Sequence, residues 1–409
     1  MDLFIMAWKN IFRNRRRSIL NITALSLGTV FIIFGLGWVG GYHKYIYGAV
    51  KDFDTGDIQI LNAGYMKEKR RIPADINLDN YEELRRELLN DNRIEAVTGR
   101  IIFPLEISKG SLSVPLLGRA ISPAEEAKIT TLSDYIEEGS YLGDKSGVLI
   151  GSSRAKKLDL KVGDPVTIKI LDKYSKPDIE ILRVTGIFSF GYPAMDDNII
   201  YMDLKTAERL LKMNNEVTKI VIKLKSHYSP EKIVGGFMRK QLADRNLNAY
   251  SWRRFAEETV SAVEADTGSF YVILVVIYVL VIIGILNSMS MSIQERYREI
   301  GTLRAIGMKQ KEIKQLFIYE GICIALISSL ISVIISLPVA GLLQFKGIDI
   351  SSAMPEELPV PFGKRFYSAF TIFHFLTGMC IAALSALVGS FIPAHRASKI
   401  NIVDVMRGN

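Results

Sequence analysis

The chain has few of the residues on which metal and redox chemistry depend. Its 409 residues include two cysteines and four histidines, and the histidines lie far apart in the sequence. Two cysteines form no disulfide framework and no cysteine-rich zinc site, and scattered histidines form no metal-binding cluster. We therefore predict neither a metal site nor a cofactor bound by this chain.

The common catalytic motifs are absent as well. The sequence has no G-x-x-x-x-G-K-S/T loop for a nucleotide, because Gly363-Lys364 is followed by Arg365, and it has no G-x-S-x-G or H-E-x-x-H motif. We interpret residues 147–153 as a strand followed by a helix that the serines cap, and Asp196 and Asp197 as solvated turn residues. The sequence thus predicts a chain that is not itself an enzyme.

Four segments contain no Asp, Glu, Lys or Arg. They cover residues 18–43, 267–294, 321–345 and 366–394, about 25 to 29 residues each. Because a bilayer core about 30 Å thick is spanned by about 20 apolar helical residues, each segment is long enough to cross a membrane. The first segment is too long for the apolar part of a signal peptide and lacks a small-residue cleavage pattern, so we expect it to remain as an anchor.

Basic residues are concentrated in three short segments. Residues 1–18, 293–315 and 393–409 hold fourteen Lys and Arg against five acidic residues, a net charge of +9 in a chain whose total is +8. Short flanking segments rich in Lys and Arg remain on the cytoplasmic side of a membrane. We therefore predict cytoplasmic termini, and we interpret the basic excess as a sign of topology and not of nucleic-acid binding.

The predicted fold is a membrane protein with four transmembrane helices, one plus three, and a large α+β extracytoplasmic (periplasmic) domain between helices 1 and 2. The predicted boundaries are a cytoplasmic amphipathic helix at 1–18, spans at 19–43, 267–292, 316–345 and 366–392, the periplasmic domain at 44–266, a cytoplasmic helix at 293–315, an outer loop at 346–365 and a cytoplasmic tail at 393–409.

The large domain shows alternating strand patterns and helical spacings. Two hairpins are predicted, one turning at Lys109-Gly110 and one with a polar tip at 172–177 between strands 166–170 and 179–184. Helices are predicted at 79–89, 204–213 and 230–242, with a strand at 220–224. We expect two lobes, with a break within 122–147.

Two ionisable residues fall in the predicted spans. Glu320 lies near the cytoplasmic end of the third span, from which we expect its carboxylate to reach the interface. His374 lies near the outer end of the fourth span without an acidic or histidine partner at helical spacing, so we expect a structural hydrogen bond and not a proton path.

The cytoplasmic segment after the second span carries the most informative motif. Ile300, Leu303 and Ile306 fall on one stripe of a helix, and Glu295, Arg298, Glu299 and Arg304 supply a charged surface. A short charged helix with apolar knobs suits docking into a groove of a partner protein. The segment resembles the coupling-helix signature E-R-x-R-E-I-G-x-L-R-A-I-G of the FtsX/MacB/LolC-LolE family of ABC transporter permeases, with matches from Glu295 to Gly307.

Three other segments resemble the same family. Residues 7–18 resemble its amphipathic elbow, with Phe4, Trp8, Ile11 and Phe12 on an apolar stripe, and residues 393–407 resemble its closing P-A-x-R-A-x-x-I-x-x-x-D-x-x-R segment. Residues 147–164, followed by residues 184–188, are similar to part of its extracytoplasmic domains.

The resemblance implies a permease subunit of a mechanotransmission transporter. Two copies of a separate ABC ATPase would bind ATP and magnesium, and a second permease subunit, identical or a sister, would complete the complex. The residues that would couple to the ATPase are Glu295, Arg296, Arg298, Glu299, Gly301, Leu303, Arg304 and Gly307.

The substrate that the resemblance favours is a lipoprotein, extracted from the inner membrane for transfer towards the outer membrane. MacB proper carries its ATPase fused at the N-terminus, whereas here only a few residues precede the elbow stripe. The alternatives are a MacB-like exporter of peptides, lipids or small molecules and an FtsX-like regulator of a periplasmic cell-wall enzyme.

Two further sets of residues are candidates for substrate and partner contacts. An acyl cavity would be lined by Trp38, Tyr42, Tyr45, Phe270, Tyr271 and Leu274, for which the alternative is an ordinary aromatic belt at the membrane surface. A periplasmic lipoprotein carrier would bind the hairpin tip, for which the alternative is a plain surface turn: Asp172, Lys173, Tyr174, Ser175, Lys176 and Pro177.

Overall fold

The computed structural model describes residues 3–13, 15–68, 71–73, 75–110, 112–143, 147–191, 193–238, 242, 245–349 and 365–399. The chain forms two compact units, and each is described by itself. The helical unit consists of Met1–Lys44, Val263–Asp349 and Arg365–Asn409. The sheet domain consists of Tyr45–Ala262 and Ile350–Lys364.

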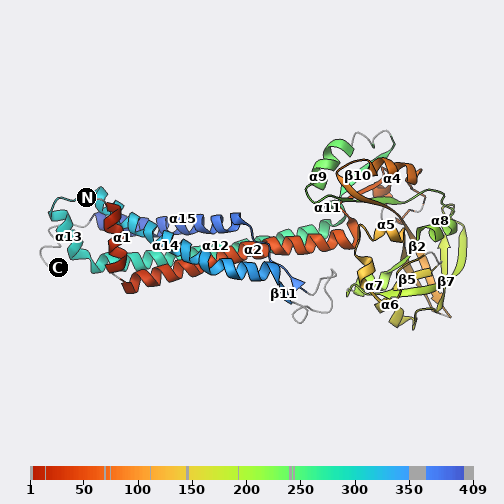
Figure 1. Cartoon of the computed structure of the whole chain (residues 1–409), viewed down its shortest axis with the longest axis horizontal. Coiled ribbons are helices and arrows are strands. Elements are labelled where there is room, and N and C mark those ends of the chain that lie inside the picture. The colour runs from red at the N-terminus through yellow and green to blue at the C-terminus, as the bar shows by residue number, and fades with distance from the viewer. Residues whose placement is uncertain are drawn as a thin grey trace. The chain divides into compact units, whose positions relative to one another are not determined.

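Long apolar helices dominate the helical unit (Figure 1). They are α2 (Arg15–Val50), α12 (Glu257–Glu295), α14 (Gln310–Phe345) and α15 (Ile372–Ser398), and within the described residues these four are long and apolar enough to cross a membrane. Two short helices, α1 (Leu3–Arg13) and α13 (Tyr297–Ala305), and a small pairing of β11 (Ile348–Asp349) with β12 (Arg365–Phe366) complete the unit. The predicted fold class, one plus three spans around a large domain, is confirmed.

The helices do not end where the charge-free segments end. α2, α12 and α14 continue past the predicted spans because the helical backbone extends into polar sequence, and α15 begins only at Ile372. Most of the predicted outer loop, 350–364, and the end of the predicted tail, 400–409, lie outside the described residues. The predicted boundaries of the membrane-embedded portions therefore stay predictions.

The interior of the helical unit is a shared apolar cluster. It includes one or more side chains from every helix of the unit, among them Ile11, Leu25, Ile285, Ile300, Phe317 and Ala386. Buried hydroxyls between α2 and α14 are satisfied by main-chain carbonyls, since Ser332 Oγ donates to Ser26 O at 3.1 Å.

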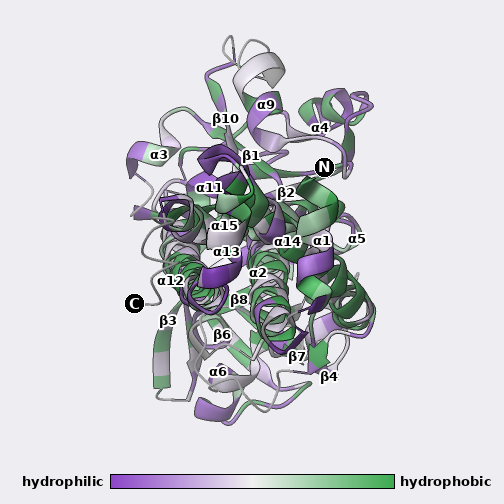
Figure 2. Cartoon of the chain, turned by 90° about the vertical axis from the view of Figure 1, so that its left-hand side faces the viewer, coloured by the Kyte–Doolittle hydropathy of each residue, from purple (hydrophilic) through white to green (hydrophobic). Residues whose placement is uncertain are grey.

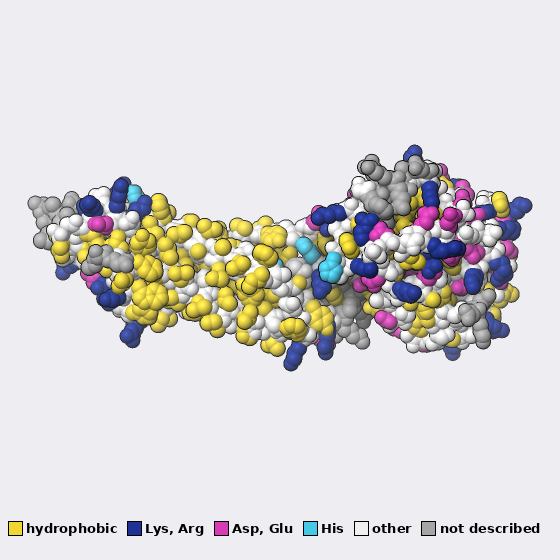
Figure 3. All heavy atoms as spheres, turned by 45° about the horizontal axis from the view of Figure 1, so that its top comes forward, with side chains coloured by type: hydrophobic (Ala, Val, Ile, Leu, Met, Phe, Trp, Pro, Cys, Tyr) yellow, Lys and Arg dark blue, Asp and Glu magenta, His cyan; other side chains and the backbone are white. Residues whose placement is uncertain are grey.

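The surface of the helical unit is hydrophobic along the long helices (Figure 3). The most apolar window of α12 is 6% buried, whereas the corresponding windows of the other three long helices are each 39% buried. α12 therefore exposes most of its apolar surface to lipid or to another chain.

Six strands of the sheet domain close into a barrel. Each strand pairs with the next in the order β2, β3, β8, β5, β7 and β6, and β6 returns to β2. The strands are β2 (Ile94–Lys109), β3 (Leu112–Ile121), β5 (Gly147–Gly151), β6 (Pro165–Leu171), β7 (Pro177–Phe188) and β8 (Ile199–Asp203).

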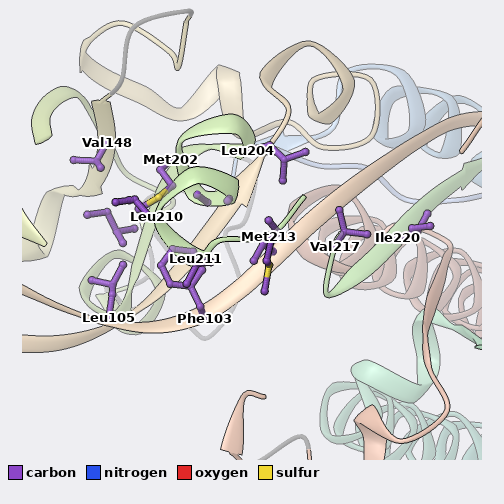
Figure 4. Close-up of a cluster of buried hydrophobic side chains, with 14 of the residues drawn as sticks. Phe103, Leu105, Val148, Met202, Leu204, Leu210, Leu211, Met213, Val217 and Ile220 are labelled. Atoms are coloured by element: carbon purple, nitrogen blue, oxygen red, sulfur yellow. The ribbon is translucent and has the colours of Figure 1, made fainter. Parts of the chain in front are cut away.

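A large apolar core belongs to this barrel and the adjoining sheet (Figure 4). Phe103 and Leu105 lie two residues apart on β2, so both point to the same face of the strand, where Val148 of β5 and Met202 of β8 join the same cluster. Leu149, between two core residues of β5, belongs to a second cluster with Phe188 and Tyr201. Both faces of β5 are therefore covered.

The long strand β2 also belongs to a second part of the sheet. Its N-terminal half pairs with β9 (Lys219–Leu224), which continues through β1 (Ile58–Asn62) to β10 (Leu247–Ser251). β4 (Ile136–Gly139) extends the other end along β7. Because β2 runs through both parts, the two expected lobes form one compact unit.

Short helices connect these strands. They are α3 (Tyr65–Glu68), α4 (Tyr81–Leu89), α5 (Pro123–Glu126), α6 (Ser152–Lys157), α7 (Pro193–Asn198), α8 (Leu204–Leu211), α9 (Pro230–Ile233) and α11 (Trp252–Phe255), with a 3₁₀ turn at Leu132–Tyr135 and π-helical turns at Lys51–Thr55 and Val234–Met238. The region expected to hold a break, 122–147, carries α5, the 3₁₀ turn and β4.

The sequence predicted several of these elements. Both hairpins are confirmed, since β2 pairs with β3 and β6 pairs with β7 around the predicted tips. The helices expected at 79–89 and 204–213 are α4 and α8, and the strand at 220–224 is β9. The helix expected at 230–242 is only partly regular, because α9 gives way to a π-helical turn and residues 239–241 lie outside the described residues.

Candidate functional site

The predicted coupling segment, residues 295–307, contains a short helix held between two tight connections. α12 ends at Glu295, Arg296 interrupts the helix with φ of −98° and ψ of 15°, and α13 then runs to Ala305. Gly307 follows with φ of +106°, a conformation that side chains disfavour, and so turns the chain towards α14. Glu312 accepts the Lys309 N–H at 2.6 Å and caps the start of α14. Figure 2 shows α13 as hydrophilic in front of mostly hydrophobic helices.

A buried ion pair ties this segment to α14. Arg296 Nη1 lies 3.1 Å from Glu320 Oε2, and the two side chains are 7% and 6% exposed. The Arg296 guanidinium also lies over the Phe317 ring, 5.4 Å from its centre. The expectation that Glu320 reaches the interface is therefore wrong, because its carboxylate is already neutralised by a partner in the interior.

The same arginine begins a chain of charges that reaches α1. Arg296 Nε donates to Glu299 Oε2 at 3.2 Å, and Arg13 at the end of α1 pairs with that same carboxylate. Burial acts to raise the pKa of Glu299, but the bonds from Arg296 and Arg13 outweigh it, so the pKa lies below its usual value. α1, α13 and α14 are thus joined by alternating charges.

The predicted coupling residues divide between two faces of the segment. Arg296 and Gly301 are buried, whereas Glu295, Arg298, Glu299 and Gly307 are exposed and Leu303 and Arg304 are half-buried. Of the predicted apolar stripe, Ile300 is buried in the cluster of the helical unit and Ile306 is 79% exposed. One end of the stripe thus anchors the segment, and the other presents an apolar side chain.

The elbow stripe divides in the same way. Ile11 is 3% exposed and packs in the shared cluster, whereas Phe4, Trp8 and Phe12 are each at least 40% exposed. Phe4 also makes an edge contact with Tyr319 of α14, with ring centres 6.1 Å apart. α1 therefore lies against the helices with one face and leaves aromatic rings on the other.

The six candidate cavity residues have different environments. Trp38 stacks with Phe366 at 4.3 Å between ring centres, and the Tyr42 hydroxyl donates to Asp266 Oδ2 at 2.8 Å. Leu274 packs against Gly35, where an added Cβ would lie 2.7 Å from it. The remaining three divide between the units, since Phe270 and Tyr271 are exposed in the helical unit and Tyr45 belongs to the sheet domain.

The β6–β7 hairpin tip is organised by one aspartate. Asp172 Oδ1 accepts the N–H groups of Tyr174 and Lys176 at 2.9 and 2.8 Å, and Lys212 lies 2.6 Å from Oδ2. Hydrogen bonding by Lys212 and the two N–H groups lowers the pKa of Asp172. Lys173 pairs with Glu216 at 2.7 Å, and Tyr174, 64% exposed, is presented at the tip together with the exposed Ser175, Lys176 and Pro177.

Three local interpretations of the sequence have different outcomes in the structure. Residues 147–153 are a strand and a helix as expected, but no serine side chain caps α6. Asp196 is 2% exposed and accepts the Phe190 N–H at 3.0 Å, so it is a buried turn anchor and not a solvated residue. His374 Nδ1 accepts the Thr371 N–H at 3.4 Å, the structural hydrogen bond that we expected.

Comparisons with known proteins agree with this architecture. Residues 18–236 match the MacB-like periplasmic core domain, and residues 271–402 match the C-terminal region of FtsX-like permeases. The chain is 25% identical to an uncharacterized ABC transporter permease of Methanocaldococcus jannaschii, covering 100% of this chain and 98% of the relative.

The chain covers different shares of the length of two further relatives. The chain is 20% identical to the lipoprotein-releasing system transmembrane protein LolE of Haemophilus influenzae over 93% of this chain and 92% of the relative. It is 22% identical to the macrolide export ATP-binding/permease protein MacB of Agrobacterium fabrum over 98% of this chain but 60% of the relative.

The periplasmic region of MacB from Actinobacillus actinomycetemcomitans, a solved structure, is 14% identical with a TM-score of 0.37, covering 53% of this chain and 97% of that structure. The two family matches together cover both the domain and the last three long helices, and the first of them alone spans more than half of the chain. The chain is therefore a multi-pass membrane protein of the FtsX/MacB family of ABC transporter permeases, the non-catalytic subunits that bind no cofactor themselves and work with a partner ATPase.

Proposed function

We propose that this chain is the permease of an ATP-driven complex that releases lipid-anchored proteins from the membrane. The observation that carries the proposal is the coupling segment, in which the buried Arg296–Glu320 pair fixes α13 while Arg298 and Ile306 remain exposed. A partner that pushes on the exposed face would act on a helix that is bonded to α1 and α14. This is the arrangement that transmission of force from an ATPase requires.

In this proposal the coupling segment and both termini face the cytoplasm and the sheet domain faces the periplasm. The support is the cluster of basic residues at the end of the helical unit that carries α1 and α13, visible in Figure 3. The boundaries of the spans and domains predicted from the sequence, from the helix at 1–18 to the tail at 393–409, are part of this proposal. A second permease subunit would cover α12, whose apolar surface the chain itself leaves exposed.

The lipoprotein substrate is the finer part of the proposal. It is supported by the similarity to LolE over nearly the full length of both chains. Transfer of an acyl chain from bilayer to water costs about 0.8 kcal/mol per CH₂, so release needs ATP and a sheltered apolar surface. We assign that surface to the aromatic residues around Trp38 and Phe270, and we assign contact with a carrier protein to Tyr174 at the hairpin tip.

The test is release from vesicles. The full chain with its co-purifying ATPase is reconstituted with a diacylated protein, and protein freed from the vesicles is measured with ATP and with a non-hydrolysable analogue. We expect release only with ATP, and none of it when the ATPase is omitted. Retention of the acylated protein under ATP hydrolysis contradicts the proposed substrate.

A second candidate is export of a soluble peptide or small molecule. It is supported by the match of residues 18–236 to the MacB-like periplasmic core domain and by the similarity to MacB. The two functions are separated by asking which compound stimulates the ATPase of the same vesicles: acylated protein for release, or a soluble peptide or macrolide for export. If the complex instead regulates a cell-wall enzyme, neither compound would stimulate its ATPase.

A further inference from the structure

The end of α2 is bonded into the middle of the sheet. α2 runs without interruption to Val50, and a π-helical turn, Lys51–Thr55, continues it. Gly56 then turns the chain with φ of +59°, and an added Cβ there would lie 2.5 Å from Val221 of β9. Asp57 N–H donates to the Ile222 carbonyl at 2.9 Å, so the turn enters the sheet directly.

Two buried arginines hold this turn. Arg119 Nη1 of β3 lies 3.0 Å from Asp54 Oδ1, and Arg100 of β2 donates to the Asp54 carbonyl oxygen and lies 3.5 Å from Oδ1. Arg100 is completely buried, and Arg119 is 5% exposed. The two arginines come from adjacent strands of the barrel, so a single aspartate is linked to both.

Each arginine is held in turn by a group of the domain. Arg100 forms a fork with Glu126 of α5, with Nη2 to Oε1 at 2.6 Å and Nε to Oε2 at 3.1 Å. Arg119 Nη1 donates to the Tyr201 hydroxyl of β8 at 3.3 Å. Other groups of the sheet domain therefore hold both guanidinium groups in place independently of Asp54, so the two arginines form a preformed binding site for the turn.

The charges of this cluster are close to balance. Two arginines face two carboxylates, and the remaining cation is Lys219 of β9, whose nearest bonded partner is the Gln59 side chain at 3.4 Å. Burial lowers the pKa of Lys219 to about 7, and Arg100 and Arg119 act in the same direction. Burying these charges costs free energy unless each one has its partner in place. A displacement of Asp54 away from the arginines is therefore unfavourable.

We propose that Asp54, Arg119 and Arg100 form a clamp that fixes the end of α2 to β2 and β3, and that these positioning residues make the sheet domain follow each movement of α2. The inference rests on the proposed function, in which the spans drive the domain. π-helical turns are rare and are frequently found at functional sites, and here the turn is the segment that the clamp holds. Without the clamp, the turn would act as a hinge. A movement of α2 would then bend the turn and would not be passed on to the sheet domain.

The first test measures rigidity and requires neither ATPase nor substrate. In the full-length chain with Cys323→Ala and Cys380→Ala, spin labels are attached at Gly48→Cys, where an added Cβ meets open space, and at the exposed Lys169→Cys of β6. The intact clamp gives a narrow distribution of label-to-label distances. Asp54→Asn broadens the distribution, because neutralising the carboxylate releases Arg119.

The second test separates positioning from stability. Asp54→Asn alone leaves Arg119 buried without its counter-ion and is expected to weaken folding, whereas Asp54→Asn with Arg119→Met removes both charges and keeps the Arg100–Glu126 fork. The double variant should melt close to the wild type yet still show the broad distribution. In the release assay its amount of product per ATP hydrolysed should fall about tenfold, with basal ATP hydrolysis unchanged.

The matched control removes an exposed arginine–carboxylate fork elsewhere in the same domain. Glu180→Gln with Arg209→Met breaks bonds of 2.7 and 3.0 Å between β7 and α8, and both the distance distribution and the product per ATP should stay as in the wild type. A narrow distribution in the clamp double variant overturns the proposal, and so does undiminished release per ATP. If the wild type releases no acylated protein, the proposed function fails while the distance measurement still decides whether the clamp exists.

Discussion

Arg296 and Glu320 form an ion pair in the interior of the helical unit, with Nη1 and Oε2 3.1 Å apart. One residue stands at the break between α12 and α13, and the other stands on α14 beyond the turn at Gly307. The pair therefore links the start of the coupling segment to α14, the helix that follows it, and so fixes the segment at its base.

Removing one partner of this pair should destabilise the protein and uncouple it. Glu320→Gln leaves Arg296 buried without a counter-ion, for which the expected loss is about 3 kcal/mol of unfolding free energy. Thermal unfolding in detergent micelles measures the loss. Glu320→Met with Arg296→Met should restore most of the stability without restoring coupling of ATP hydrolysis to release. The control, Glu257→Gln, affects an exposed pair with Arg254 and should change neither quantity.

Ile306 should contribute to ATPase binding and not to folding. Its side chain is 79% exposed, so Ile306→Ser leaves the melting temperature unchanged. If Ile306 fills a pocket on the ATPase, the substitution should weaken binding by about tenfold, a typical effect for a buried interface anchor. Titration of the labelled ATPase onto the reconstituted chain gives the dissociation constant. Leu112→Ser, at a 56% exposed apolar residue of the β2–β3 hairpin, is the control and should leave the affinity as it was.

The order of the hairpin tip should depend on the ionisation of Asp172. Because hydrogen bonding lowers the pKa of Asp172 in the folded chain, its stabilising effect is present above the ordinary pKa of an aspartate and is lost as the pH falls through the lower, folded value. Hydrogen exchange of residues 171–177, corrected for the intrinsic rate, should show protection that disappears on acidification. Asp172→Asn should remove this pH dependence, and Asp178→Asn should retain it.

Lys219 should make the sheet domain more stable at alkaline pH. Its pKa is about 7 when folded and ordinary when unfolded, so between these values the unfolded chain binds the extra proton. The unfolding free energy should rise with pH above 7, by at most about 1.4 kcal/mol per pH unit. Melting curves from pH 6 to about 9 test this. Lys219→Met should abolish the rise, whereas a rise that persists in this variant assigns it to another group; Lys205→Met is the exposed control.

The features that the sequence predicted are those with local causes. The charge-free segments predicted the four long helices, and alternating apolar residues with a polar tip predicted the β6–β7 hairpin. The charged motif from 295 to 307 predicted a short helix after the second span, which is α13, while its coupling role stays a prediction. In each case the signal is contained in fewer than about forty consecutive residues, within reach of helical and strand periodicities.

The incorrect or missing interpretations concern charged side chains whose partners lie on a different structural element, beyond the reach of a single helical or strand period. Glu320 finds its partner 24 residues away, and Arg100 meets Asp54 across 46 residues. Asp196 was interpreted as a solvated acid, but the Ser189 hydroxyl and the Phe190 N–H, which follow β7, both donate to it, and no periodicity of the sequence indicates such a turn. An arginine within the apolar strand 94–103 was the available signal for the clamp, because a buried guanidinium requires an anion nearby.

The closed barrel also determines where another chain could add a strand. Eight of the ten strands have neighbours on both sides, so among the described residues the sheet has open edges only at β10 and β4. β4 is four residues long, exposes Glu137 and Glu138, and ends at Gly139 with φ of +82°. Short, charged edges of this kind resist edge-to-edge pairing. At its β4 edge the domain therefore has little tendency to aggregate through its sheet, even at high local density on a membrane surface.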